Sequence, residues 1–310
     1  MWNHLLPLRQ AGIMTVSVSR WPIDVLPSGH WQRVIAELDP VRDHEQITRI
    51  STAYEFPWDT AMSLSLALFR TFAVPSIGGL LHETGEFTTR PQKRYDDTTL
   101  ILDAIGQHGM ASPRGRSAIR RMNQMHRSYA ISDDDMRYVA STFVVVPTRW
   151  NAAYGWRPLL RSEIDAAVAY WSALGRRMGI SELPTTYEGY ERLMDGYERE
   201  HFRYDPRSRA VADATLDLAA TFYPGVSRRA SRSMVLALLD EPLLDALGYP
   251  LPSRRLRAAA EGALRLRGQI VRRLPARRRP FTAERLRWVR SYPHGYLIER
   301  LGTFPTEPRA

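Results

Sequence analysis

The chain of 310 residues contains no cysteine and a single lysine, Lys93. The absence of cysteine excludes disulfides, iron–sulfur clusters, thiolate-ligated haem and zinc sites built on cysteine. The sequence also lacks a Walker A loop, a nucleophile elbow and a dinucleotide-binding glycine fingerprint, so it does not indicate the enzyme classes that those motifs mark. Its composition, with 44% hydrophobic and 25% charged residues, is that of an ordinary globular protein.

Long apolar runs are also missing. The longest apolar stretch covers residues 60–81, but Arg70 splits it near the middle and Pro75 breaks its second half. A spanning helix needs about 20 mostly apolar residues, so we predict a buried or membrane-dipping helix here. Residues 1–20 show no basic region followed by an apolar run, as a secretory signal would. We therefore expect a cytoplasmic protein, with peripheral contact at the membrane surface as a further option.

The basic residues are concentrated near the C-terminus. Residues 251–290 hold thirteen arginines against two glutamates, a net charge of +11, although the whole chain carries only +10. Within residues 253–290 the arginines alternate with leucine, isoleucine and valine at helical spacing, which is typical of a basic amphipathic helix on an anionic membrane. A helix docked on the protein's own body is an equal alternative. A nucleic-acid arm ranks below both, because no DNA- or RNA-binding motif accompanies the arginines.

The spacing of apolar residues predicts an all-α protein, because they recur every three or four positions and strand-like alternation is scarce. We expect a single globular helical domain over residues 51–250, with an N-terminal arm packed on it (1–50) and a basic C-terminal helical segment (251–310). The predicted helices cover residues 60–72, 96–106, 115–129, 133–154, 163–178, 187–202, 208–222 and 227–239.

Capping residues and one proline mark the course of two of these helices. Ser132 precedes the helix at 133–154 and Ser162 precedes the next one, and serine is a favoured N-cap residue. Pro147 should kink or end the first of these helices, because proline lacks the N–H that a helix interior requires.

One helix face carries a candidate ligand for a metal or cofactor. Four residues of the predicted helix at 115–129 share this face: Ile119, Met122, His126 and Tyr129. A histidine in an apolar stripe is suited to ligate a haem iron while Met122 shields the porphyrin from water. Arg121 and Arg127 lie beside the stripe, where they are suited to pair with haem propionates. Spacing alone favours the plainer alternative, a core histidine held by a hydrogen bond.

Several motifs resemble the MpaB branch of the MpaB and latex-clearing (rubber oxygenase) family. They occur in the family's order as TGEFTTRPQKRYDDT (84–98), RMNQMHRSYAISDDDM (121–136), PTRW (147–150), YGWRPL (154–159) and SYPHGYLIERLG (291–302). The resemblance implies a helical domain that encloses a haem pocket, with haem b as the cofactor. It also implies an oxygenase that acts with dioxygen on a small apolar substrate, with an isoprenoid chain as the leading candidate.

The resemblance assigns roles to three residues. Relatives carry the proximal haem ligand at the histidine of an R-M-N-x-x-H motif, and His126 stands at that position. Latex-clearing proteins also carry an arginine and a threonine four residues apart beside the haem. Arg94 and Thr98 have this spacing, which places them on one helix face. The resemblance therefore implies that both act on dioxygen or that Arg94 holds a propionate, whereas the plain alternative is a solvated helix start.

One position departs from the latex-clearing pattern. The residue before the threonine is a lysine thought to reach the iron in those proteins, whereas this chain has Asp97, so distal ligation by lysine is not available there. Family members also need an acid near the haem. Glu83 and Glu86 are the candidates, and the favoured alternative is that both are surface residues of the loop at Gly85.

Two other functional classes stay open beside the haem-dependent oxygenase. A haem-binding sensor or carrier would bind haem and consume no dioxygen with substrate. A basic interaction module for a membrane or a nucleic acid would bind no haem, and its binding would depend on salt.

Overall fold

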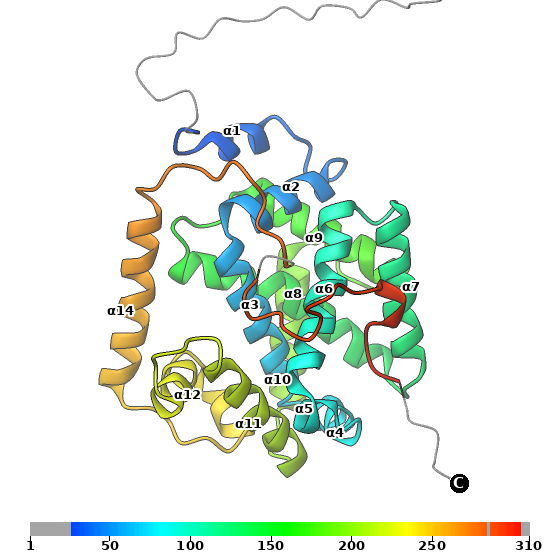
Figure 1. Cartoon of the computed structure of the whole chain (residues 1–310), viewed down its shortest axis with the longest axis vertical. Helices are drawn as coiled ribbons and strands as arrows, with labels where there is room; N and C mark the ends of the chain where they lie inside the picture. Colours follow the sequence, from blue (N-terminus) through cyan, green and yellow to red (C-terminus); the bar gives the residue numbers. More distant parts are fainter. Residues whose placement is uncertain (1–25, 284–285, 305–310) are drawn as a thin grey trace, which may run out of the picture.

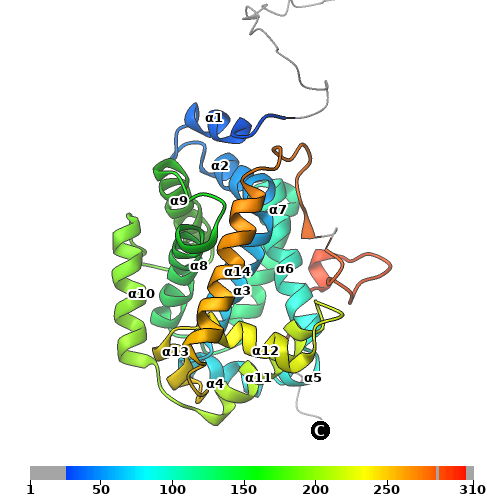
Figure 2. The ribbon, with the colours of Figure 1, turned by 90° about the vertical axis from the view of Figure 1, so that its left-hand side faces the viewer.

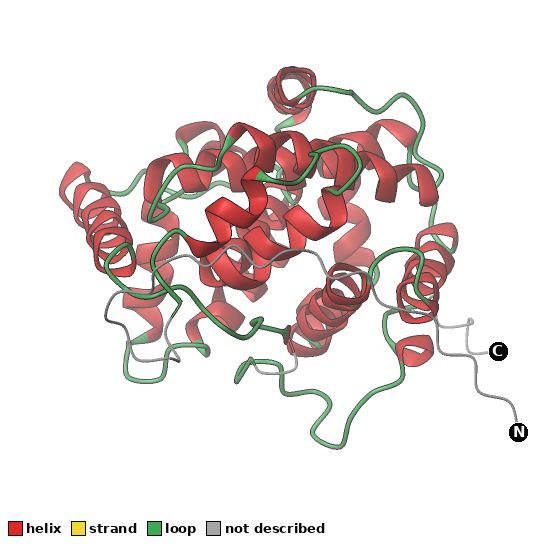
Figure 3. Cartoon of the chain, turned by 90° about the horizontal axis from the view of Figure 1, so that it is seen from above, coloured by secondary structure: helices red, strands yellow, loops and turns green. Residues whose placement is uncertain are grey.

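The computed structural model describes residues 26–283 and 286–304, and within these ranges every regular element is helical (Figure 1 and Figure 3). The all-α prediction is confirmed. The first elements are α1 (His30–Ala36), α2 (His44–Ile50), a π-helical turn η1 (Ser51–Glu55), α3 (Pro57–Thr71), α4 (Pro75–Glu83), α5 (Glu86–Thr89), α6 (Pro91–His108) and α7 (Pro113–Arg127). They are followed by α8 (Asp133–Tyr154), α9 (Arg161–Arg177), α10 (Tyr187–His201), α11 (Pro206–Ala220), α12 (Arg228–Ala237), α13 (Glu241–Ala246), α14 (Arg254–Val271) and a short 3-10 turn η3 (Ile298–Arg300).

All eight predicted helices are present, and five of them begin earlier than predicted, four of these with a proline in the first turn. The helices α3, α6, α7 and α11 each have a proline in their first turn. Proline fits there because its missing N–H is one that the first turn leaves unpaired in any case, and its fixed φ suits a helix. The prolines therefore belong to the helices and do not precede them.

Of the two serines predicted to cap helices, one does so and the other does not. The Ser132 hydroxyl accepts the Asp135 N–H at 3.0 Å and caps α8 as predicted. Ser162 does not cap α9, because the helix already begins at Arg161 and the Glu163 carboxylate accepts the Leu160 N–H at 2.7 Å.

Pro147 lies inside α8, which continues to Tyr154. The helix predicted over residues 133–154 is therefore confirmed, and of the two effects predicted for Pro147 the end of the helix does not occur. Because Pro147 has no N–H, it leaves unpaired the carbonyl four residues before it, that of Phe143, and α8 continues on the hydrogen bonds on either side.

The apolar stretch at residues 60–81 forms two helices where one was predicted. Between α3 and α4 the chain bends by 97°, and Pro75 begins the second helix. No single helix in the described ranges is long and apolar enough to cross a membrane, although the bent α3–α4 pair meets that test by length and composition.

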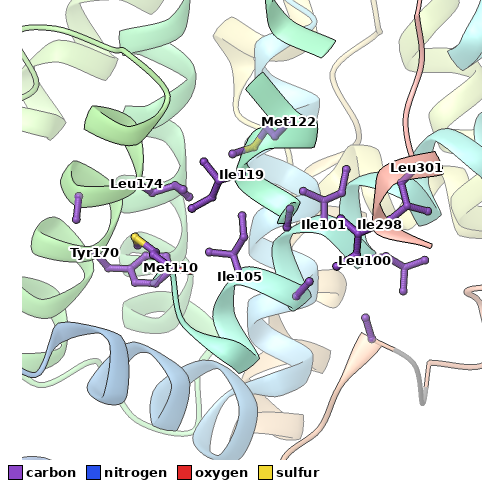
Figure 4. Close-up of a cluster of buried hydrophobic side chains, with 14 of the residues drawn as sticks. Leu100, Ile101, Ile105, Met110, Ile119, Met122, Tyr170, Leu174, Ile298 and Leu301 are labelled. Atoms are coloured by element: carbon purple, nitrogen blue, oxygen red, sulfur yellow. The ribbon is translucent and has the colours of Figure 1, made fainter. Parts of the chain in front are cut away.

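The helices pack in pairs around the middle of the molecule. α3 and α10 pack on α8, α7 packs on α6, α2 packs on α9, and α4 packs on α11 (Figures 1 and 2). One hydrophobic cluster joins α6, α7 and α9 to the C-terminal segment, where Ile298 and Leu301 contribute side chains (Figure 4). The chain after α14 therefore returns to the body and completes the core.

The N-terminal arm, in its described part, packs on the body through α1 and α2. Ile35, Ile47 and Ile50 are buried in a cluster with Ala166 of α9. The first 25 residues of the predicted arm lie outside the described residues. The division of the chain at residues 50 and 250 stays a prediction.

Candidate functional site

An apolar cavity of about 310 Å³ lies between α3, α6, α8, α9 and α11. Its volume is at the lower end of the range for small-molecule sites. The aliphatic and aromatic lining residues include Leu64, Leu68, Tyr95, Leu102, Phe143, Val144, Trp171, Leu218 and Phe222, and the returning C-terminal segment adds Phe281 and Leu286. The lining is gathered from six separate parts of the chain, so the cavity is a product of the tertiary fold.

α6 places both predicted catalytic residues at this cavity. Arg94 and Thr98 are one helical turn apart on α6, and both line the cavity wall. The Arg94 guanidinium donates a hydrogen bond to the Thr98 hydroxyl, and that hydroxyl can donate to the Arg94 carbonyl at 3.1 Å. The guanidinium also lies 5.3 Å from the centre of the Phe87 ring. Arg94 and Thr98 therefore form one polar unit in a mainly apolar wall.

Burial lowers the pKa of Arg94, and the negative charges of Asp97 and Glu86 oppose this shift. An arginine keeps its proton in a protein under such conditions. The bond that its guanidinium makes within the described residues goes to a neutral hydroxyl, with no carboxylate as an ion-pair partner. A cation in this state is suited to hold an anionic group of a bound molecule.

His126 lies near the end of α7, close enough to Arg94 for the charge of the guanidinium to lower the pKa of the imidazole. Burial and the positive charge of Arg94 lower the pKa of the imidazole from 6.5 to about 4. The imidazole is therefore neutral at pH 7. Its Nδ1 atom is buried and has no hydrogen-bond partner among the described residues. His126 does not itself line the cavity, but Arg94 connects the two because it lines the cavity and acts on the histidine.

These residues fit a haem by the chemistry of their donor atoms. An iron ligand must be a neutral imidazole with a nitrogen lone pair to offer, and the buried, unpartnered Nδ1 shows that the ring is not held by a hydrogen bond at that atom. The partly buried Arg94 offers a cation for a propionate. The plainer alternative from sequence, a core histidine held by a hydrogen bond, finds no support at Nδ1, and nothing decides it at the other ring nitrogen.

The other three residues predicted to contact haem do not line the cavity. Met122 is buried in the cluster between α6, α7 and α9 (Figure 4). The Arg121 guanidinium donates to the Leu301 carbonyl at 2.5 Å, and Arg127 is exposed. The structure therefore brings together His126, Arg94 and Thr98, and it places Arg121 and Met122 in the packing of the C-terminal segment and the core.

Asp97 lies on a different side of α6 from the cavity-lining pair. Its buried carboxylate accepts from the Lys93 ammonium at 2.7 Å and from the Tyr292 hydroxyl. Asp97, at the position compared above with the lysine of latex-clearing proteins, therefore fastens the C-terminal segment to α6, and the chain's only lysine is engaged with it.

The two candidate acids differ in their surroundings. Glu86 is buried, and its carboxylate is paired with Arg90. The side chain of Glu83 is 61% exposed and pairs with Arg207 at 2.7 Å. Of the two, only Glu86 lies near enough to Arg94 to affect its pKa.

A buried ion cluster beside the cavity was not predicted. Arg157 donates to Glu55 at 2.7 Å and to Glu163 at 2.5 Å, and Ser51 donates to Glu163 at 2.6 Å. Ser51 and Glu163 both line the cavity. Burial raises the pKa of Glu55, against the opposing effect of Arg157. The YGWRPL motif contains this arginine, but nothing in its spacing names the two carboxylates.

A family model described as "ER-bound oxygenase mpaB/B'/Rubber oxygenase, catalytic domain" matches residues 56–273, which is more than half of the chain. The chain belongs to this family. The resemblance seen in its motifs is thus confirmed. The range that matches the MpaB/rubber oxygenase domain contains Arg94, Thr98 and His126, and it extends to the end of α14.

Three curated proteins are similar to this chain. An "ER-bound oxygenase mpaB'" of Penicillium brevicompactum is 29% identical over 71% of the chain, and an "ER-bound oxygenase mpaB" of Penicillium roqueforti (strain FM164) is 29% identical over 66%. An "ER-bound oxygenase mpaB" of Penicillium brevicompactum is 32% identical over 62% of the chain. The chain spans 56% of the length of the two Penicillium brevicompactum relatives and 74% of the third.

The low pKa of His126 predicts that the folded protein loses stability in acid. The native pKa is about 4 and the ordinary value is 6.5, so the unfolded chain binds a proton more readily. His126 therefore contributes its full stabilisation of the folded state above pH 6.5, and this contribution is lost as the pH falls towards 4. We expect His126 to account for about 2 kcal/mol of lost unfolding free energy between about pH 6.5 and about pH 4.5.

Urea unfolding of haem-free protein at several pH values measures this loss. A His126→Leu variant should lose less stability over the same pH interval, by that same amount. Equal pH dependence in the parent and the variant would show that His126 is not buried as described.

Proposed function

We propose that this chain binds haem b through His126 and uses it to oxidise a small apolar substrate with dioxygen. The observation that carries the proposal is the neutral, partly buried His126 beside the Arg94–Thr98 pair in the wall of an apolar cavity. Membership of a family described as oxygenases supports the reaction class.

Haem b would supply the ability to activate dioxygen, which no side chain of this protein provides. In this proposal a ring nitrogen of His126 would hold the iron, and Arg94 would hold a propionate or orient dioxygen. The Thr98 hydroxyl would donate a hydrogen bond to dioxygen at the same place. The aliphatic and aromatic lining binds the substrate and excludes water.

The lining favours a substrate without charge, and an isoprenoid chain with C=C bonds is the class that we propose. Cleavage of one C=C bond by one dioxygen molecule gives two carbonyl groups. Both oxygen atoms are then accounted for, and no external reductant is consumed. Insertion of oxygen without cleavage is the other outcome within the same reaction class.

The names of the three relatives describe them as ER-bound. For this chain we propose work at a membrane surface on its cytoplasmic side, with peripheral attachment. An apolar isoprenoid substrate would dissolve in that membrane.

Dioxygen consumption by the haem-loaded protein with a prenyl alcohol as probe tests the proposed activity. Thr98→Val keeps the shape of the side chain and removes the hydroxyl, and we expect kcat/KM to fall by about ten- to a hundredfold. Thr88→Val is the matched control, because its exposed hydroxyl bonds the Gly85 carbonyl on α5, away from the cavity lining.

An unchanged kcat/KM in Thr98→Val at full haem loading would contradict the role of Thr98. Stable haem binding without any substrate-dependent dioxygen consumption would favour a sensor or carrier in place of the oxygenase.

A further inference from the structure

α14 is fastened to the body along one side. Arg267 of this helix pairs with the buried Asp59 at 2.8 Å, and its guanidinium lies 3.9 Å from the centre of the Trp58 ring. A Cβ atom added to Gly268 would lie 3.0 Å from the carbonyl oxygens at the end of α8, so the two helices are in close contact there. Ala260 is fully buried on the same side. These contacts fix which face of α14 points outward (Figure 2).

The outward face of α14 carries large apolar side chains. Leu266 is 58% exposed, Ile270 is 52% exposed, and Leu274, just after the helix, is 55% exposed. They follow one another at intervals of four residues, so they form one line along the helix. Isolated exposed leucines need no explanation, but a continuous line of them indicates an interaction site.

Arginines lie on the same outward face. Arg255 is eleven residues before Leu266 and Arg273 is seven residues after it, which are about three and two helical turns. Both arginines are exposed, as are Arg265 and Arg272 beside the apolar line. The outward face therefore combines a stripe of aliphatic side chains with a row of positive charges.

We infer that the outward face of α14 docks on an anionic lipid bilayer. A bilayer surface takes up aliphatic side chains at the level of the acyl boundary and attracts arginines to its headgroups at the same time. A second copy of this chain fits less well, because a two-fold contact would bring the same arginines face to face. A nucleic acid would attract the arginines but would leave the line of aliphatic side chains exposed to water.

The segment that follows α14 leads to the cavity wall. Phe281 follows the end of α14 by ten residues, lines the cavity and donates its N–H to the Ala53 carbonyl at 2.9 Å. Docking of α14 would therefore place a membrane-bound helix ten residues before a part of the cavity wall, which suits a substrate dissolved in the bilayer. This consequence rests on the proposed function, whereas the docking itself requires neither haem nor substrate.

Sedimentation with vesicles tests the docking on the full chain. The vesicles contain phosphatidylcholine with about 30 mol% phosphatidylserine, or phosphatidylcholine alone. We expect binding to the anionic vesicles, at least about tenfold weaker binding without phosphatidylserine, and weaker binding at high salt. Leu266→Gln/Ile270→Gln should weaken binding to anionic vesicles about tenfold, and Arg255→Gln/Arg273→Gln by a similar factor.

The matched control is Val41→Gln/Leu297→Gln, which alters two apolar side chains exposed elsewhere, 70% and 57% respectively. This variant should bind as the parent does. An Ile270→Trp variant should show a blue-shifted emission on anionic vesicles, which a purely electrostatic contact would not give.

Vesicle binding that both α14 variants retain would overturn the docking. Binding to duplex DNA with none to vesicles, or self-association that the α14 variants abolish, would replace the bilayer by another partner. Because haem-free protein serves for all these measurements, a failure of docking is distinguishable from a failure of the proposed oxygenase activity.

Discussion

Replacing Arg157 with leucine is expected to lower the free energy of unfolding by about 3–5 kcal/mol. The side chains of Arg157, Glu55 and Glu163 are 9%, 4% and 1% exposed, and the arginine pairs with both glutamates. Removing the guanidinium leaves two buried carboxylates together without a cation. The loss of such a partner costs far more than the pair itself contributes, because each remaining charge stays desolvated.

The free energy of unfolding of the Arg157→Leu variant should also depend on pH. Burial already raises the pKa of Glu55 in the parent, and without the arginine nothing opposes this effect. A carboxyl group whose folded pKa is raised contributes stability at low pH that is lost as the pH rises through that pKa. The variant should therefore recover much of its stability in acid, where its carboxyl groups bind protons.

Urea unfolding at neutral and acidic pH measures both effects. Arg149→Leu is the matched control, because Arg149 also joins two carboxylates, Glu191 and Asp195, but its side chain is 42% exposed. We expect that variant to lose at most about 1 kcal/mol. Equal losses in the two variants would show that the burial of the Arg157 cluster does not determine its contribution.

The helices could be predicted from the sequence because apolar periodicity is a local signal. Four of the five late predicted starts share one cause, since Pro57, Pro91, Pro113 and Pro206 each belong to the first turn of a helix and look like breaks in a sequence. Pro147 could not be judged locally either, because the helix continues past it in the packed interior.

The site could be predicted only in part. Helical spacing places Arg94 and Thr98 on one face of α6, and the structure shows that face in the cavity wall. Spacing does not say which neighbour a face meets, and this is why Arg121 and Met122 were assigned to a haem when they pack against the C-terminal segment and the core. The roles of all these residues towards haem stay predictions.

No local pattern in the sequence predicts the cavity or the Arg157 cluster. Glu55 and Arg157 are 102 positions apart in the sequence and meet only because η1 packs beside the segment that follows α8. Asp97 shows the same limit, since its departure from the latex-clearing pattern is visible in the sequence but its bond to Tyr292, 195 positions away, is not.

His126→Ala is expected to have the largest effect of any single change, the loss of haem binding. Its imidazole is neutral because of burial and the nearby Arg94, and its buried Nδ1 has no partner to release. Binding of the ring to iron would therefore require neither loss of a proton from an imidazolium nor loss of a hydrogen bond at Nδ1. His108→Ala, at the exposed end of α6, is the matched control and should bind haem as the parent does.

The absorption spectrum of protein expressed with added haem precursor tests the central claim most directly. The account predicts a strong Soret band in the parent and in His108→Ala, and its loss or shift in His126→Ala. A parent that is colourless and does not bind added haemin, or a His126→Ala variant with an unchanged Soret band, would contradict ligation of haem by His126.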